Sequence, residues 1–343
     1  MRALVTGGAG YFGTLLVNKL LQQNYEVRIF DLNRPDPPIP GVEVVQGDIG
    51  DMSALANACK GMDVAFHNVA HNPLAKDDAL FWAVNRDGTA NLLRASLEQN
   101  VAKVVYTSTS AVFGAPKILP VTEETTASPM EVYGRAKLAG ETVCHEYAAR
   151  GLDASIVRSP TILGHGRLGI FQLFFEWIYR GSNIPVLGGG KNKFQFIHAD
   201  DLADACILAS QRKGAETYNC GADRFGTMRE AIEHLCRYAG TGSRVRSLPL
   251  GPIVLGMNIA SALRVSPLAP YHALMYGRPM YFDVTKAKTQ LGWRPRYSNE
   301  EMFVDSYRWY VANRESILHR SDGASRHQIA LGEGALFLVR WLL

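Results

Sequence analysis

The chain has 343 residues, of which 47% are hydrophobic and 20% charged, and its formal net charge is +4. These values are ordinary for a globular protein, and this small charge, without blocks of Lys and Arg among aromatics, argues against nucleic-acid binding. Five scattered cysteines without metal-ligand spacing predict buried thiols in a reducing compartment.

The first residues of the chain predict a strand, a tight turn and a helix. Residues 2–6 form an apolar run typical of a buried strand, and residues 11–22 carry leucines and valines at helical spacing. Between them, Gly7 and Gly10 let the backbone turn and approach a pyrophosphate, whose charge the helix N-terminus stabilises. Gly13 lets the helix pack closely on the strand. The pattern therefore predicts a dinucleotide site.

A second predicted strand, residues 26–30, ends in Asp31. A carboxylate at this point accepts hydrogen bonds from the ribose hydroxyls of NAD and repels the 2′-phosphate of NADP. NAD is therefore the expected cofactor. NADP is the less favoured alternative, kept because Arg34 lies nearby.

The alternation of elements continues through the first half of the chain and predicts an α/β protein with a doubly wound parallel sheet. Further strands are expected near 42–45, 63–67, 103–107 and 154–158, and helices near 53–60, 79–99 and 131–150. After residue 160 the regularity breaks. We expect a dinucleotide-binding Rossmann domain over 1–160, with 194–221 returning to it, a smaller mixed substrate lobe over 161–193 and 222–320, and an apolar tail over 321–343.

Tyr133 and Lys137 lie four residues apart on the predicted helix 131–150 and so face the same side. An adjacent positive charge lowers the pKa of a tyrosine, which makes Tyr133 a usable general acid or base. The strand before this helix ends in a run of hydroxyls that includes Thr107, Thr109 and Ser110. A hydroxyl at a strand end can hydrogen-bond the substrate oxygen that Tyr133 protonates or deprotonates.

In order and spacing these motifs resemble the extended short-chain dehydrogenase/reductases of the NAD-dependent epimerase/dehydratase superfamily, over about residues 1–315. The matching segments include Gly47-Asp48-Ile49, 67–70, 85–93, 158–160, 196–203 and 291–293. The resemblance implies a catalytic triad of Thr109, Tyr133 and Lys137, and a homodimer through helices 79–99 and 131–150. It implies cofactor contacts from Gly7, Gly10, Tyr11, Phe12, Gly13, Asp31, Asp48, Ile49, Asn68, Val69, Ala70, Asn85, Thr107, Tyr133, Lys137, Pro160 and Ile162.

Departures from the family pattern narrow the reaction. The sugar 4,6-dehydratases place Asp-Glu directly after the catalytic Thr, and nucleotide-sugar decarboxylases carry Glu where Ala111 stands. This chain has Ser110-Ala111 at these positions, which argues against both reactions. What remains is hydride transfer, either net, as in a dehydrogenase or reductase, or returned, as in an epimerase.

Nucleotide-sugar epimerases usually carry an Arg where this chain has Phe194, and a nearby lysine replaces a guanidinium fork poorly. Residues 281–288 look more like the 3β-hydroxysteroid dehydrogenase and keto-acid reductase branch. The apolar, proline-interrupted stretch 248–274 is compatible with a lid over an apolar ligand and equally with an ordinary packed helix and loop. We expect an apolar or amphipathic small-molecule substrate, with a nucleoside-diphosphate-sugar 4-epimerase using tightly bound NAD as the alternative. A non-catalytic NAD-binding regulatory protein is a third reading, disfavoured by the intact triad.

Ser110, His165 and Phe194 are the candidate substrate residues, although a solvated loop histidine is the favoured interpretation of His165. We expect no metal site, because His67 and His71 have no carboxylate in ligand register.

The chain enters its first strand at once, which leaves no room for a signal peptide and predicts a cytoplasmic protein. The tail is far too short to span a bilayer, and three roles stay open: docking on its own domain, covering a partner subunit, or peripheral contact with a membrane.

Overall fold

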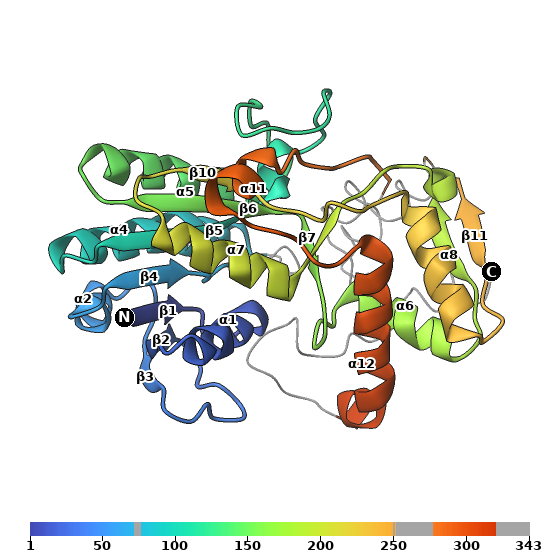
Figure 1. Ribbon diagram of the computed structural model, residues 1–343, viewed down its shortest axis with the longest axis horizontal. Helices are drawn as coiled ribbons and strands as arrows, with labels where there is room; N and C mark the ends of the chain where they lie inside the picture. Colours follow the sequence, from blue (N-terminus) through green and yellow to red (C-terminus); the bar gives the residue numbers. More distant parts are fainter. Residues whose placement is uncertain (72–76, 250, 252–276, 320–343) are drawn as a thin grey trace.

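Short apolar runs form the strands of a central sheet in the computed structural model, which describes residues 1–71, 77–249, 251 and 277–319. The seven strands are parallel and follow the order β10-β6-β5-β4-β1-β2-β3 (Figure 1). Their bounds are β1 Arg2–Thr6, β2 Glu26–Asp31, β3 Glu43–Gln46, β4 Val64–His67, β5 Lys103–Thr109, β6 Ala154–Ser159 and β10 Thr217–Asn219. The predicted α/β fold with a doubly wound parallel sheet is confirmed.

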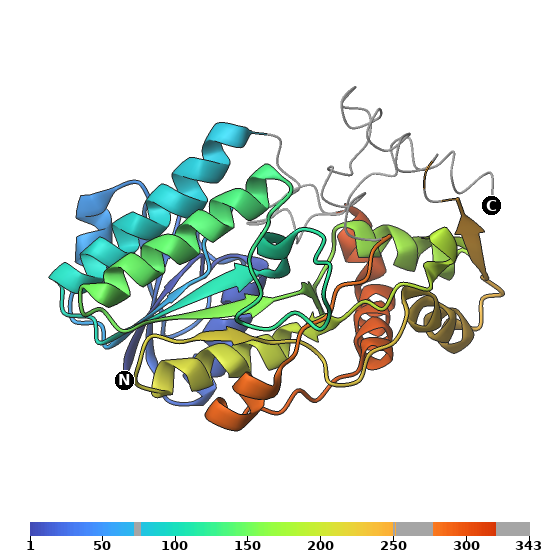
Figure 2. The same cartoon turned by 90° about the horizontal axis from the view of Figure 1, so that it is seen from above.

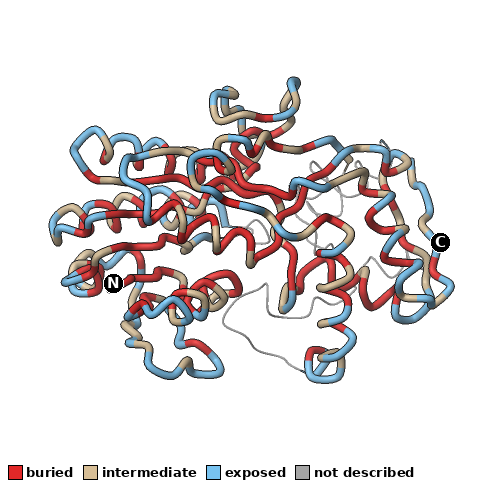
Figure 3. The backbone as a smooth tube through the Cα atoms, in the orientation of Figure 1, coloured by how far each residue is buried: buried red, intermediate tan, exposed pale blue. Residues whose placement is uncertain are grey.

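Helices cover both faces of the sheet, so its strands are buried on both sides (Figures 2 and 3). On one face lie α1 (Tyr11–Gln22) and α7 (Ala199–Gln211), and on the other α2 (Met52–Cys59), α4 (Gly88–Glu98) and α5 (Val132–Ala149). Successive residues of β1 show the alternation: Val5 belongs to one apolar cluster and Leu4 to the other.

The second half of the chain adds a smaller lobe at the carboxyl ends of the strands. It contains two parallel strand pairs, β7 (Thr161–Leu163) with β9 (Phe196–His198) and β8 (Ile184–Leu187) with β11 (Val245–Leu248), and the helices α6 (Ile170–Tyr179), α8 (Met228–Ala239) and α12 (Asn299–His319). Helix α11 (Thr285–Leu291) instead packs against α7 and β10 at the central sheet. Glu176 of α6 is buried and accepts hydrogen bonds from Tyr310 at 2.6 Å and from Arg314 at 2.7 and 2.8 Å. These bonds tie α6 to α12.

Two elements differ in detail from the sequence expectations. The helix expected at 79–99 is divided into α3 (Asp78–Trp82), a π-helical turn at Ala83–Asp87, and α4. The strand expected at 103–107 continues to Thr109, which brings the last hydroxyls onto the sheet. The stretch 248–274 falls largely outside the described residues, and the tail 321–343 falls wholly outside them. No helix in the described part of the chain is long and apolar enough to cross a membrane.

Candidate active site

The turn between β1 and α1 is built by glycines that leave no space for a side chain. Gly7 has φ of +74°, and a Cβ on it would lie 2.9 Å from the backbone nitrogen of Val69. A Cβ on Gly13 would lie 2.0 Å from the carbonyl oxygen of Gly7. Helix α1 therefore starts directly against the turn, and its free N–H groups point toward the ends of the strands.

A groove of about 330 Å³ lies over this turn. Most of its lining comes from residues that the sequence predicts for the cofactor: Gly7, Gly10, Tyr11, Phe12, Gly13, Asp31, Asp48, Ile49, Asn68, Val69 and Ala70. The groove is also lined by Gly47 of the matching segment Gly47-Asp48-Ile49, and by residues that the sequence reasoning did not assign to the cofactor: Phe30, Leu32, Asn33, His71 and Val84. Most of these adjoin a predicted residue in the chain, which is the signal that could have found them.

Two polar side chains in the groove fit a dinucleotide. The carboxylate of Asp31 accepts from the backbone N–H of Ala9 at 3.1 Å and of Asn33 at 3.0 Å, and burial raises its pKa. Asn68 accepts from the Thr107 hydroxyl at 2.6 Å, while its buried Nδ2 has no hydrogen-bond partner among the residues that the structure describes. An orphaned donor beside a glycine cradle suits a polar ligand, because a buried donor without a partner is costly.

The other predicted cofactor residues surround the groove without lining it. The Asn85 side chain forms two hydrogen bonds to the backbone of His71. Its Oδ1 accepts from the His71 N–H at 3.0 Å and its Nδ2 donates to the His71 carbonyl oxygen at 3.1 Å, which fixes the chain after β4. Pro160 is buried between β6 and β7, and Ile162 of β7 pairs with Ile197.

Tyr133 lies in the first turn of α5 and Thr109 at the end of β5. The Glu131 side chain caps α5 by accepting from the backbone N–H groups of Tyr133 and Gly134, each at 2.7 Å. The Tyr133 ring packs edge-on against Phe81, with centroids 6.1 Å apart. The Thr109 hydroxyl accepts from the backbone N–H of Ala111 at 3.2 Å at the start of a short 3-10 helix.

Lys137, one turn after Tyr133, is 2% exposed. Its ammonium donates to the carbonyl oxygen of Thr107 at 2.7 Å, which fixes it at the carboxyl end of β5. Burial lowers the pKa of Lys137 to about 7, although Glu141 and Cys144 favour the charged form. Burial therefore weakens the charged form of this ammonium, and its polar neighbours oppose that effect.

A buried ion pair that the sequence reasoning missed holds α5 against the sheet. Glu141 accepts from Arg158 of β6 at 3.0 and 2.7 Å and from the Ser108 hydroxyl of β5 at 2.5 Å. The available signals were an acid one turn after Lys137 and an arginine at the end of an apolar strand.

His67 is neutral and belongs to a buried hydrogen-bond chain. Burial, followed by the charge of Lys137, lowers the pKa of His67 to about 3. Thr89 donates to the Asn85 carbonyl, so its hydroxyl oxygen accepts from His67 Nε2 at 3.0 Å. Nδ1 then accepts from the Thr6 hydroxyl at 2.8 Å.

The three candidate substrate residues lie in different surroundings. Ser110 is buried beside Thr109, and its hydroxyl has no hydrogen-bond partner. Phe194 is fully buried and packs on Phe196 with centroids 4.9 Å apart, away from the groove lining. His165, whose side chain is 47% exposed, lines a second cavity of about 1030 Å³ instead. Tyr11 lines both the groove and this second cavity.

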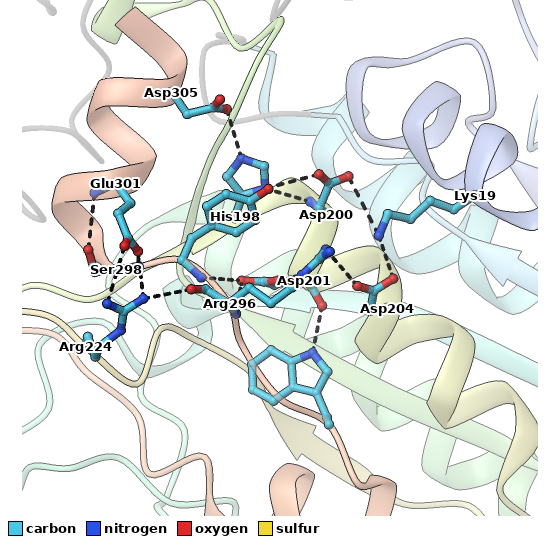
Figure 4. Close-up of polar contacts among 12 residues, drawn as sticks. Lys19, His198, Asp200, Asp201, Asp204, Arg224, Arg296, Ser298, Glu301 and Asp305 are labelled. Carbon is cyan, nitrogen blue, oxygen red and sulfur yellow. Dashed lines mark hydrogen bonds and ion pairs between the residues drawn. The ribbon is translucent and has the colours of Figure 1, made fainter. Parts of the chain in front are cut away.

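Beside the second cavity, a polar network joins α7, α12 and the segment between α11 and α12 (Figure 4). His198 Nδ1 accepts from the Asp200 N–H at 3.1 Å and its Nε2 donates to Asp305 at 3.2 Å, while its ring stacks on Tyr297 at 3.8 Å. Hydrogen bonds from His165 and His198 hold the pKa of Asp305 well below its usual range.

Potential metal-ligand atoms of His165, His198 and Asp305 lie within 4.8 Å of one another. A histidine that ligates a metal donates its other N–H to an acceptor. Here Nδ1 of His198 receives a backbone N–H, which leaves the proton on Nε2. The cluster is therefore arranged for hydrogen bonding, with Nε2 as the donor to Asp305.

The chain belongs to the NAD dependent epimerase/dehydratase family, whose model matches residues 3–221. This assignment confirms the resemblance stated from the motifs and the expectation of NAD as cofactor.

Relatives of the chain cover nearly its full length. It is 54% identical over 99% of its residues to the uncharacterized protein y4nG of Sinorhizobium fredii, covering 86% of that protein. It is 28% identical to the 3 beta-hydroxysteroid dehydrogenase/Delta 5-->4-isomerase of Mycobacterium tuberculosis, over 91% of this chain and 90% of that protein. The structure of the UDP-glucose 4-epimerase of Thermotoga maritima superposes with a TM-score of 0.78 at 24% identity, covering 92% of this chain and 100% of that one. That superposition supports the fold.

Proposed function

We propose that the protein is an NAD-dependent dehydrogenase or reductase that interconverts a secondary alcohol and a ketone, with Tyr133 as the acid/base. The observation that carries the proposal is the buried ammonium of Lys137, fixed by the Thr107 carbonyl at 2.7 Å one helical turn from Tyr133. A protein that only binds a dinucleotide has no use for a buried ammonium one helical turn after a candidate acid/base.

Different groove residues would bind different parts of the cofactor. The glycine turn and the N-terminus of α1 would hold the pyrophosphate, Asp31 the adenosine ribose, and Lys137 the nicotinamide ribose. NAD bound in this way supplies the hydride acceptor for an alcohol and, when reduced, the hydride donor for a ketone.

The side chains of the site handle the proton. In the oxidising direction the Tyr133 phenolate takes the proton of the substrate hydroxyl as the carbon gives up hydride, and in the reducing direction the phenol returns it to the ketone oxygen. The positive charge of Lys137 favours the phenolate. Thr109 donates a hydrogen bond to the same substrate oxygen, and the orphaned Ser110 hydroxyl offers a second polar contact.

The substrate we propose is apolar or amphipathic, of the 3β-hydroxysteroid or keto-acid type, bound by the lobe over 161–193 and 222–320. Phe194 supports this, because it is core-buried where nucleotide-sugar epimerases usually carry an arginine. Lys191 and Lys193 are exposed, so neither forms a fixed fork for a diphosphate.

Replacing Tyr133 by Phe tests the proposal. A panel of 3β-hydroxysteroids and 2-hydroxy acids is assayed for NADH formation at 340 nm, and the best substrate is carried into the variant. Tyr133→Phe should lower kcat by about two to four orders of magnitude and leave NAD binding intact. Tyr147→Phe, on the same helix, is the control and should keep full activity. Near-normal turnover in Tyr133→Phe would refute the assignment.

The second candidate is a nucleoside-diphosphate-sugar 4-epimerase, favoured by the reaction after which the family is named. Absorbance near 340 nm before and after denaturation separates the two. Tightly retained NAD(H) with no net spectral change on turnover of UDP-sugars supports the epimerase. Free exchange of NAD(H) with net NADH formation supports the dehydrogenase.

A further inference from the structure

The aromatic ring of Tyr106 lies against the ammonium of Lys137. Tyr106 is fully buried in β5, and the Lys137 nitrogen is 4.1 Å from its ring centroid. The ring is held on this spot by α5: its hydroxyl donates to the Lys137 carbonyl at 3.5 Å, and a Cβ on Gly140 would lie 2.4 Å from the hydroxyl oxygen. The contact is therefore part of the packing between β5 and α5.

Besides this ring, Glu141 and the Thr107 carbonyl favour the charged form of Lys137. Within the described part of the chain, no carboxylate forms an ion pair with it. Glu141, the nearest acid on its own helix, already receives Arg158 and Ser108. The Thr107 carbonyl takes one of its three N–H donors. Burial penalises a charged ammonium, and the negative face of an aromatic ring offsets that penalty most strongly where water is excluded.

Several titratable groups lie near Lys137. Glu141 and Cys144 of α5 and His67 of β4 interact with it electrostatically, Tyr106 lies against it, and Tyr133 stands one turn earlier on α5. His67 is neutral, and burial raises the pKa of Cys144 well above its ordinary value, so that thiol is neutral as well. The charge of Glu141 is shared with Arg158.

We propose that Tyr106 is a positioning residue, whose ring face keeps Lys137 charged and aimed at the reacting end of the site. The inference rests on the proposed function, because it concerns the lysine that acts on Tyr133. It extends that function to a residue that has no place in the predicted triad. Losing the ring should lower the pKa of Lys137. The alkaline limb of the pH–rate profile, where activity is lost as pH rises, should therefore shift to lower pH.

The test replaces Tyr106 by Phe and then by phenylalanines carrying one, two and three ring fluorines, which withdraw electron density from the ring face with little change in shape. Lysine labelled with ¹³C at Cε reports the pKa of Lys137 by NMR in the NAD-bound protein, with Lys137→Met used to assign the signal. From Phe to trifluorophenylalanine the pKa should fall by about one unit. The alkaline limb of the pH–rate profile should move with it. The same fluorinated series at Tyr147 should leave the pKa of Lys137 unchanged.

The outcomes separate this inference from the function on which it rests. A graded fall along the Tyr106 series, with Tyr106→Phe close to the unsubstituted protein, supports the ring contact. An unchanged Lys137 pKa along the series overturns it, even if Tyr133→Phe abolishes turnover and so upholds the proposed function. Because the NMR titration needs no substrate, a graded fall would uphold the contact even if Tyr133→Phe stayed active and the proposed function failed.

Discussion

Breaking the Glu141–Arg158 pair should destabilise the protein strongly, and removing both partners should restore most of the loss. The two residues are 1% and 7% exposed, and two hydrogen bonds of 3.0 and 2.7 Å join them. Glu141→Leu leaves a buried guanidinium without its counter-charge, and Arg158→Met leaves a buried carboxylate. Each loss should cost about 3–5 kcal/mol of unfolding free energy. Ser108 also loses its acceptor in Glu141→Leu, which adds about 1 kcal/mol.

The double variant should cost much less than the two single variants together, because apolar side chains of similar volume replace a buried pair almost neutrally. If the double variant loses about 1 kcal/mol, the coupling energy in this cycle should therefore be at least about 5 kcal/mol. Urea unfolding followed by far-UV circular dichroism at fixed NAD concentration measures it. Single losses under about 1 kcal/mol, or a double variant that loses the full sum, would refute the reasoning. Arg94→Met, which breaks the exposed Arg94–Glu98 pair, is the control and should leave stability nearly unchanged.

Two further outcomes are expected. Burial of Glu176 would raise its pKa, but hydrogen bonds from Arg314, Tyr310 and Arg180 outweigh it and lower the pKa to about 2 from 4.5. A carboxyl group whose pKa is depressed in the folded protein stabilises the fold at pH values above its unfolded pKa. This contribution should therefore fade as pH falls from 4.5 through 2. Thermal melts across this range should show that the melting temperature falls less steeply in Glu176→Gln than in the unsubstituted protein. Gly13→Ala should abolish NAD binding, measured by calorimetry, because its Cβ would lie 2.0 Å from the Gly7 carbonyl oxygen, whereas Asn18→Ala on the exposed side of α1 should bind normally.

Local patterns predicted the sheet and the groove because both depend on residues close in sequence. Apolar runs gave the strands, and the spacing of Gly7 and Gly13 specified a turn in which one glycine packs on the other. Asp31 followed from its place after the second strand. The structure places all three in one groove.

Pairings between distant segments escaped the sequence reasoning. Glu141 and Arg158 belong to different elements, and either could have been a solvated charge. The stacking of His198 on Tyr297 and its bond to Asp305 join segments about a hundred residues apart. The π-helical turn at Ala83–Asp87 interrupts a stretch whose helical spacing gives no warning of it. Such contacts are set by how the elements pack, and one sequence carries no record of that.

Tyr11 makes the cofactor groove and the cavity along α1 and α12 neighbours that share a wall. It lines both spaces, and within the described part of the chain its buried hydroxyl makes no hydrogen bond. A substitution of Tyr11 that enlarges one space therefore alters the other. Engineering the larger cavity to accept a ligand would change cofactor affinity at the same time, so variants of this region are best judged on both properties together.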